Sequence, residues 1–258
     1  MTESEVRPDR IVGSVFLVGA GPGDPGLITL KGLELIRRAD AVVYDGLIDP
    51  SLLEHCKPGV RLFQVGKRDR LQHLPQDEVN RLLVREAREG RVVVRLKGGD
   101  PFIFGRGGEE ADALVDAGVP FEVVPGVSAG VGVPAYAGIP LVHRGFTSEL
   151  VFLTGHQCES QPSPVDWSRY GGGSATLVIF MGVESLPEVA RELMANGRAP
   201  SCPVAVIENG ATGDQRTIAA PLSRIVEEVA AAGVQPPALI VVGEVVALRD
   251  KIRWFKEA

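Results

Sequence analysis

One stretch of the chain combines glycines, charges and aromatic rings more densely than a structural loop requires. It runs from Arg95 to Glu110 and holds five glycines, two phenylalanines and four charged side chains before Glu109. It directly follows the apolar, β-branched run 92–94, which predicts a buried strand. Glycines let a backbone come close to a ligand, and α/β proteins bind ligands in the loops at strand carboxyl ends. The stretch therefore predicts a ligand-binding loop rather than a long turn with a basic rim.

Two further strand ends carry side chains that can move protons. Asp45 follows the apolar run 41–44, and Lys67 follows the run 61–65, with Arg68 next to it. The ends of neighbouring parallel strands meet at one sheet edge, so Asp45 and Lys67 form a plausible acid–base pair. A plain ion pair at the rim of the sheet explains the same two residues equally well.

A glycine-rich run also follows the first predicted strand, at 21–26. Its letters, Gly-Pro-Gly-Asp-Pro-Gly, formally satisfy the dinucleotide pattern Gly-x-Gly-x-x-Gly. A dinucleotide site needs backbone N–H groups aimed at a pyrophosphate, and Pro22 and Pro25 remove two of these donors. The run therefore favours a stiff loop beside an uncharged adenosine group over a nicotinamide or flavin site.

Other loops rich in small residues follow predicted strands later in the chain. They are 125–130, 180–182 and 208–212. Each is unspecific alone, since small residues also serve tight helix packing and Met181 is a common core residue type. Taken together with the loops above, they describe a pocket between two halves of the chain.

Strand and helix patterns alternate and set the expected fold class. Strands are predicted near 14–18, 41–44, 61–65, 92–94, 121–124, 150–153, 176–180, 204–207 and 238–242, and helices near 29–39, 76–89, 109–116, 187–195 and 221–231. Such alternation implies parallel sheets covered by helices on both faces. We predict an α/β protein with mostly parallel sheets, organised as a disordered leader at 1–13, an N-terminal domain at 14–145 and a C-terminal domain at 146–258.

Two of these helices have well-defined apolar faces. In the first, Thr29 is the expected N-cap, and the apolar face is Leu30, Leu33, Ile36 and Ala39. In the second, the apolar face is Val79, Leu82, Leu83 and Ala87, and Gly90 ends the helix.

The composition excludes several function classes. The 258 residues carry a net charge of −6, which argues against a general nucleic-acid binder. No apolar run approaches the ~20 residues of a membrane span, and the start lacks a signal-peptide pattern. The three cysteines lie far apart, at Cys56, Cys158 and Cys202. They predict neither a disulfide framework nor a metal site, which fits a reducing, cytoplasmic compartment. No pattern for nucleophilic hydrolysis appears.

Two runs resemble a known family. Residues 18–32, VGAGPGDPGLITLKG, resemble the opening of the tetrapyrrole (class III) methyltransferases, and 94–110, VRLKGGDPFIFGRGGEE, resemble the signature of members that methylate uroporphyrinogen III. The resemblance covers about 14–246. It implies two α/β domains, S-adenosylmethionine in the cleft between them, a homodimer, and successive methylation of uroporphyrinogen III at C2 and C7 to precorrin-2. The dehydrogenase/ferrochelatase module of bifunctional relatives is not seen, as expected of a stand-alone enzyme.

The resemblance also implies roles for single residues. Asp45 matches the proposed proton acceptor, Lys67 the proposed donor and Arg95 an active-site arginine. The implied cofactor contacts are Pro22, Gly98, Gly99, Asp100, Ile103, Ser128, Ala129, Met181, Gly210, Ala211 and Ala238. Arg68 and Arg106, with Lys67 and Arg95, are the cations expected near the substrate carboxylates. No metal site is implied. Gly46 stands where relatives often carry arginine, which puts in doubt a substrate contact at that position.

Two alternatives remain open at this point. One is another methylase of the same fold that acts on a later corrinoid, on RNA or on protein. The other is a non-catalytic module that binds a nucleotide-like ligand. The basic, glycine-rich loop together with Asp45 favours the tetrapyrrole enzyme over both.

Overall fold

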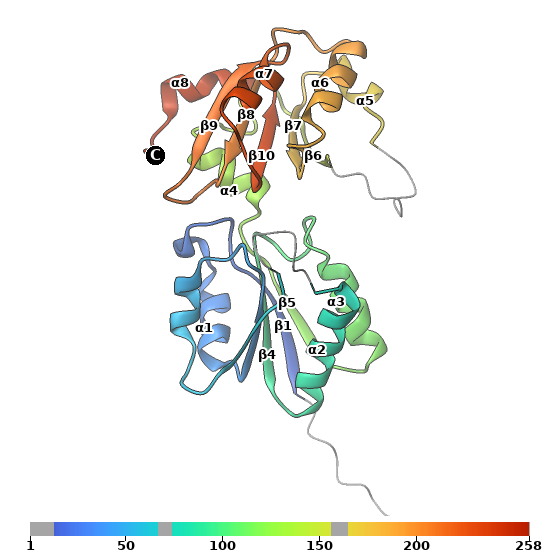
Figure 1. Ribbon diagram of the computed structural model, residues 1–258, viewed down its shortest axis with the longest axis vertical. Coiled ribbons are helices and arrows are strands. Elements are labelled where there is room, and N and C mark those ends of the chain that lie inside the picture. Colours follow the sequence, from blue (N-terminus) through green and yellow to red (C-terminus); the bar gives the residue numbers. More distant parts are fainter. Residues whose placement is uncertain (1–12, 67–73, 156–164, 258) are drawn as a thin grey trace, which may run out of the picture. The chain divides into compact units, whose positions relative to one another are not determined.

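The computed structural model describes residues 13–66, 74–155 and 165–257. It forms two compact units, a first unit at Met1–Val127 and a second unit at Ser128–Ala258 (Figure 1). The sequence placed the boundary between 145 and 146 instead. The difference arises because the helix α4 (Ala129–Tyr136) packs on strands β7 and β10 of the second unit. Most of the expected leader lies outside the described residues, but Gly13 donates its N–H to the carbonyl of Ala87 at 2.9 Å.

The first unit is built on a parallel sheet. Its strands are β1 (Ser14–Gly19), β2 (Ala41–Tyr44), β3 (Arg61–Gln64), β4 (Val92–Lys97) and β5 (Phe121–Val124). They lie in the order β3-β2-β4-β1-β5, and the described pairs run parallel, as the sequence predicted. The connecting elements are the short 3-10 helices η1 (Pro25–Leu27) and η2 (Pro50–His55), and the helices α1 (Leu30–Arg38), α2 (Gln76–Arg88) and α3 (Gly107–Asp116).

Helices cover both faces of this sheet, because successive strand side chains point to opposite sides. Val15, Leu17 and Val93 pack with α2 and α3. Val18 and Val94 pack on the opposite face with α1 and η2. Figure 1 shows α1 on one side of the sheet and α2 and α3 on the other. Each fully buried leucine or valine contributes about 1.5–3 kcal/mol to folding.

The predicted faces of the two helices were confirmed to different degrees. In α2, Val79, Leu82, Leu83 and Ala87 are buried as expected. In α1, Thr29 caps the helix and accepts from Gly32 N–H at 3.0 Å, but Leu30 is 88% exposed. The prediction for Leu30 was wrong because the buried stripe passes through 32, 35, 36 and 39, so the first helical residue points to solvent.

The second unit has a mixed sheet. Its strands are β6 (Leu150–Thr154), β7 (Thr176–Phe180), β8 (Pro203–Glu208), β9 (Arg216–Pro221) and β10 (Ala238–Val242). They lie in the order β6-β7-β10-β8-β9, with β6 and β7 parallel and the other described pairs antiparallel. Besides α4, its helices are α5 (Ser168–Gly171), α6 (Leu186–Ala195), α7 (Ile225–Ala231), η4 (Glu244–Leu248) and α8 (Arg249–Ile252).

The antiparallel pairs correct the expectation for this half of the chain. The segment 209–215 between β8 and β9 is too short for the crossover that a parallel pair needs, so the chain turns back as a hairpin. The sequence missed β9 because alanines and a final proline weaken its strand pattern. Over both sheets the described pairs are mostly parallel, and the α/β fold class is confirmed.

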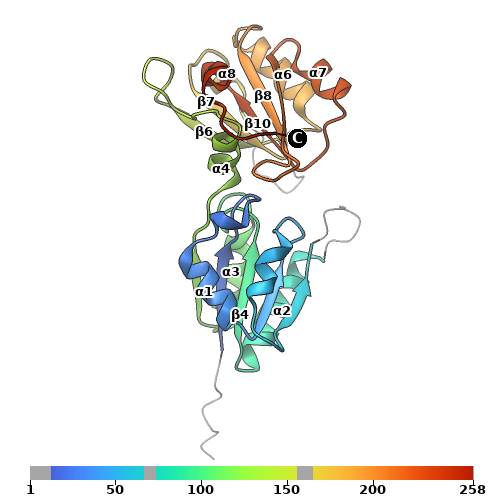
Figure 2. The same ribbon diagram turned by 90° about the vertical axis from the view of Figure 1, so that its left-hand side faces the viewer.

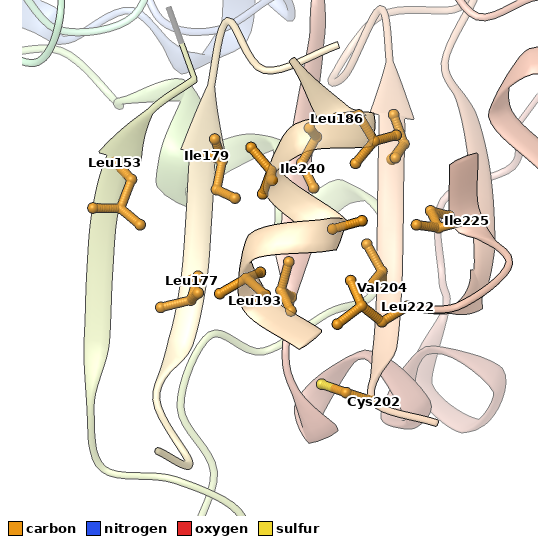
Figure 3. Close-up of a cluster of buried hydrophobic side chains, with 14 of the residues drawn as sticks. Leu153, Leu177, Ile179, Leu186, Leu193, Cys202, Val204, Leu222, Ile225 and Ile240 are labelled. Carbon is orange, nitrogen blue, oxygen red and sulfur yellow. The ribbon is translucent and has the colours of Figure 1, made fainter. Parts of the chain in front are cut away.

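Helices also cover both faces of the second sheet. On one face α6 packs Leu186 and Leu193 against Ile179 and Ile240, with Leu222 and Ile225 beside them (Figure 3). On the other face lie Val133 of α4 and Ala137, the residue that follows the helix. Within the described residues, the helices fall short of the length and apolar character that a membrane crossing requires.

Candidate active site

The carboxyl ends of β1, β2, β4 and β5 form one edge of the first sheet, where α/β folds bind ligands. Gly21 and Gly99 exchange backbone hydrogen bonds, at 3.3 Å from Gly21 N–H and 2.7 Å from Gly99 N–H. The N–H of Asp45 donates to the carbonyl of Leu96 at 3.2 Å. A Cβ on Gly126 would stand 2.3 Å from the carbonyl oxygen of Gly99, so only glycine allows this approach. The loops that hold Pro22, Asp45 and Gly98 to Ile103 therefore meet at this edge.

A buried charge cluster lies at the same edge. Because side chains alternate along a strand, Arg95 and Lys97 of β4 point to the side of the sheet that α3 covers, and Glu110 of α3 lies there. Arg95 donates from Nε to Glu110 Oε1 at 2.9 Å and from Nη2 to Asp45 Oδ1 at 2.5 Å. Lys97 Nζ donates to the same oxygen of Glu110 at 3.0 Å. Two carboxylates and two basic groups thus share one small volume.

Glu110 is the centre of this cluster. Its side chain is completely buried, and its Oε1 also accepts from Gln76 of α2 at 3.2 Å. Its Oε2 finds no hydrogen-bond partner within the described residues. Gln76 in turn donates to Asn80 at 3.1 Å, so α2 fixes the carboxylate from the outside.

The cluster sets the protonation of its two basic groups. Burial disfavours the charged form of Arg95, but Asp45 and Glu110 outweigh it and raise the pKa of the guanidinium. Burial and the neighbouring Arg95 lower the pKa of Lys97, and the two carboxylates only partly compensate. Arg95 therefore stays charged, whereas Lys97 is the group that releases its proton more readily.

Asp45 is the member of the cluster that faces solvent. Its side chain is 29% exposed, against 4% for that of Arg95. Arg95 was expected near substrate carboxylates. The structure gives it internal carboxylates instead, so it orients Asp45. β3 ends at Gln64, paired with Tyr44 at the end of β2, as predicted. Lys67 and Arg68 lie outside the described residues, so their expected meeting with Asp45 stays a prediction.

The glycine-rich loop after β4 is strained and partly apolar. Phe104 and Arg106 adopt left-handed backbone conformations, with φ of 51° and 58°. Non-glycine residues in such strained backbone conformations occur mainly at functional sites. Ile103 in this loop is an apolar residue that is 38% exposed. The carboxylate of Asp100 accepts hydrogen bonds from the N–H groups of Phe102 at 2.9 Å and Gly126 at 3.0 Å. Asp100 thus holds two loops together at the predicted cofactor position.

Arg106 forms a forked ion pair at the start of α3. Its Nε and Nη2 donate to Glu109 at 2.9 and 2.7 Å, and both side chains are more than half exposed. The hydrogen bond from Arg106 lowers the pKa of Glu109, and burial, which raises this pKa, offsets only part of the effect. A planar guanidinium exposed in this way suits carboxylate recognition.

The remaining predicted cofactor residues lie at one edge of the second unit. Met181 follows β7 with a left-handed φ of 52° and is 48% exposed. Ala238 begins β10 and pairs with Glu208, the last residue of β8, so Gly210 and Ala211 lie close by. A Cβ on Gly210 would stand 2.2 Å from Val133 Cγ1, which brings α4 to the same edge.

The N-terminus of α4 carries the last two predicted contacts. The hydroxyl of Ser128 accepts from Gly130 N–H at 3.2 Å and caps the helix, and Ala129 is its first residue. The predicted cofactor residues are thus divided between the two units, at one sheet edge in each. The cleft that joins these edges stays a prediction.

Sequence reasoning assigned no role to Lys97, Glu110 or Gln76. A signal for Lys97 was present, since a charged residue on an otherwise β-branched strand needs a buried partner. Glu110 gave a weaker signal, because a glutamate in the first turn of a helix is common on the surface.

Glycine-rich loops and a buried acid–base cluster at the carboxyl edge of a parallel sheet are typical of a ligand-binding site in an α/β protein. Residues 14–226 match the family model of the tetrapyrrole (corrin/porphyrin) methylases. The chain is 48% identical over 244 residues to a siroheme synthase of Thioalkalivibrio sulfidiphilus, which covers 95% of this chain and 50% of that protein. The chain spans about half the length of the curated relatives it matches.

Solved structures agree with the family model. The uroporphyrin-III C-methyltransferase of Thermus thermophilus, complexed with S-adenosylhomocysteine, is 42% identical, with a TM-score of 0.77 and coverage of 91% of this chain and 93% of that one. A cobalt precorrin-4 methyltransferase is 26% identical, with a TM-score of 0.81 and coverage of 90% and 95%. The chain belongs to the tetrapyrrole methylase family.

Proposed function

We propose that the protein is an S-adenosylmethionine-dependent C-methyltransferase that converts uroporphyrinogen III to precorrin-2 by successive methylation at C2 and C7. The observation that carries the proposal is the ion pair between Asp45, which follows β2, and buried Arg95 of β4, the strand that leads into the glycine-rich loop. Family membership and the 42% identity to the Thermus thermophilus methyltransferase support it. The basic loop and Asp45 favour this substrate over a later corrinoid, RNA or protein.

The residues at the two sheet edges suit S-adenosylmethionine. Apolar side chains that are partly exposed, Ile103 and Met181, stand beside small residues and strained backbone, which is the lining that an adenosyl group and a thioether chain require. When bound, the cofactor supplies an electrophilic methyl group on a sulfonium. The contacts proposed for it are the eleven positions from Pro22 to Ala238 given above.

Asp45 is proposed as the general base that accepts the proton leaving the tetrapyrrole. A carboxylate held through one oxygen by a guanidinium is fixed in orientation, which a base needs. Arg95 supplies that cation and is itself fixed by Glu110. Lys67 is proposed as the proton donor at the end of the neighbouring strand.

Arg106, Arg68 and Lys67 are proposed to bind carboxylates of the substrate. The chain as a whole carries a net charge of −6, so a polyanion needs a local basic surface to approach. Arginine forms two parallel hydrogen bonds with a carboxylate, which fixes orientation as well as affinity. Such orientation of the pyrrole carbon toward the methyl group accounts for much of the rate in a methyl transfer.

A homodimer in the cytoplasm is proposed as the working state. The family resemblance favours it, and two-fold dimers are the commonest oligomers. Light scattering at assay concentration is expected to give twice the chain mass, and a stable monomer would reject the dimer.

Incubation with isotope-labelled S-adenosylmethionine tests the proposed function. The labelled methyl group is expected to be transferred when uroporphyrinogen III is supplied as the substrate, and not when a later corrinoid or RNA is supplied. S-adenosylhomocysteine is expected to raise the melting temperature by mass action, and NAD is expected to leave it unchanged. Transfer to the corrinoid alone, or a shift with NAD alone, would replace the proposal by one of the alternatives.

A further inference from the structure

The loop between β8 and β9 is held in a costly conformation. Asn209 and Ala211 both adopt left-handed backbone angles, with φ of 48° and 60°, although neither is glycine. Such residues persist only where surrounding groups determine the conformation. The loop is also pressed against α4, because Gly210 has no room for a Cβ beside Val133. Some group must therefore keep Ala211 in place.

That group is Gln215. Its side chain is completely buried, and its Oε1 accepts the N–H of Ala211 at 2.7 Å. Its backbone N–H donates to the carbonyl of Thr212 at 3.2 Å, which closes the loop on itself. Ala211 is only 1% exposed, so this hydrogen bond is shielded from water. The amide of Gln215 thus fixes the turn from inside.

Gln215 is oriented in turn by a residue far along the chain. Its Nε2 donates to Glu257 Oε1 at 3.0 Å. Thr217 of β9 donates to the same oxygen at 2.5 Å, and Arg249 of α8 donates to Oε2 at 2.6 Å. Against burial, which acts the other way, the hydrogen bonds from Thr217 and Gln215 and the charge of Arg249 lower the pKa of Glu257. Glu257 therefore stays an acceptor for three donors.

The segment that carries Glu257 also contacts α4. Trp254 donates from its indole nitrogen to the carbonyl of Ala135 at 2.9 Å, and Tyr136 packs against Trp254 and Phe255 with ring centroids 5.1 and 5.0 Å apart. Figure 2 shows the chain leaving α8 and running back toward α4. One short segment, 254–257, thus touches both α4 and the loop 209–215.

We propose that Glu257 and Gln215 are positioning residues for the cofactor, acting through the loop 209–211. This inference rests on the proposed function, in which Gly210 and Ala211 bind S-adenosylmethionine. Gln215 and Ala211 are too buried to meet the ligand with their side chains. Their role is to hold the left-handed turn that shapes the binding edge. Loss of Glu257 leaves the amide of Gln215 unoriented, and the turn at Ala211 relaxes.

The test measures S-adenosylhomocysteine affinity by calorimetry in the full chain. Glu257→Ala is expected to weaken binding about tenfold, within the usual range for coupled positions. Glu257→Gln is expected to restore most of the affinity, because an amide oxygen still accepts from Gln215 and Thr217. The matched control is Glu228→Ala, which removes an exposed ion pair with Arg224 in the same unit and is expected to bind normally.

Two further readouts separate positioning from general stability. In Glu257→Ala, amide exchange at Ala211 is expected to quicken while exchange in α6 does not. The KM for S-adenosylmethionine is expected to rise while the KM for uroporphyrinogen III stays constant. If Glu257→Ala does not fold, Thr217→Val removes one donor only and is expected to shift affinity in the same direction.

The outcomes are distinct. Normal affinity in both Glu257→Ala and Thr217→Val would overturn the positioning role and leave the proposed function intact. Normal affinity in Thr217→Val, if Glu257→Ala does not fold, would overturn it as well. Absence of binding by the unaltered protein would overturn both.

Discussion

Removing Glu110 isolates the most strongly coupled feature of the first unit. In the folded protein two carboxylates, Asp45 and Glu110, face two basic groups, Arg95 and Lys97. Glu110→Ala leaves one carboxylate against both. Breaking a buried ion pair by removing one partner costs about 3–5 kcal/mol of folding free energy. Release of the proton from Lys97, whose pKa is already lowered, limits the loss to about 3 kcal/mol, the lower end of that range.

Urea unfolding of a set of variants measures this cost. Glu110→Gln keeps an oxygen for Arg95 and is expected to lose less, about 1.5–3 kcal/mol for a hydrogen bond to a charged group. Asp77→Ala is the control, because it removes an exposed ion pair with Arg81 on α2 and costs no more than about 0.5 kcal/mol.

Adding Lys97→Met to Glu110→Ala restores the charge balance. The double variant is expected to be more stable than the sum of the single changes predicts, by about 0.5–3 kcal/mol. A loss below about 1 kcal/mol in Glu110→Ala, the size of an ordinary neutral hydrogen bond, would refute the reasoning. Strict additivity in the double variant would refute it as well.

Three further changes test single groups. Asp45→Asn is expected to keep S-adenosylhomocysteine binding and lower single-turnover methylation by about 10²–10⁴-fold, and near-normal turnover would remove Asp45 as the base. The pKa of Lys97 in the folded protein lies below its unfolded value of 10.5, so between these two pKa values the unfolded chain binds more protons and the free energy of unfolding rises with pH. Lys97→Met is expected to flatten this rise in unfolding curves taken up to pH 10.5. The pKa of Asp40 is lowered from 3.8 chiefly by the hydrogen bond from Lys57, so the contribution of Asp40 to folding stability is present above pH 3.8 and is lost as pH falls through the folded pKa. Asp40→Asn is therefore expected to reduce the acid sensitivity of the fold seen by circular dichroism. An unchanged acid transition would count against a stabilising role of this ion pair.

The sequence predicted what local pattern determines. The apolar stripe of α2 and the loops at strand ends follow from spacing and glycine content, and the structure places them as expected. The antiparallel return through β9 was missed, because strand direction depends on connection length as well as on strand pattern. The exposure of Leu30 was missed because an apolar residue in the first turn does not reveal which side it faces.

The buried contacts of the site were beyond sequence reasoning for a different reason. Arg95 was recognised as an active-site residue, but its enclosure by Asp45 and Glu110 depends on two elements separated from it by 50 and 15 residues. Gln215 and Glu257 lie 42 residues apart and show no shared periodicity. Such pairs become visible only when packing brings their elements together.

The methylation pattern of the product tests the central claim most directly. Uroporphyrinogen III is incubated with S-adenosylmethionine that carries an isotope-labelled methyl group, and the product is examined by NMR. The account predicts labelled methyl groups at C2 and C7 with the unaltered protein and a near-complete loss of both with Asp45→Asn. Label at another carbon, or no label in the tetrapyrrole, would contradict it.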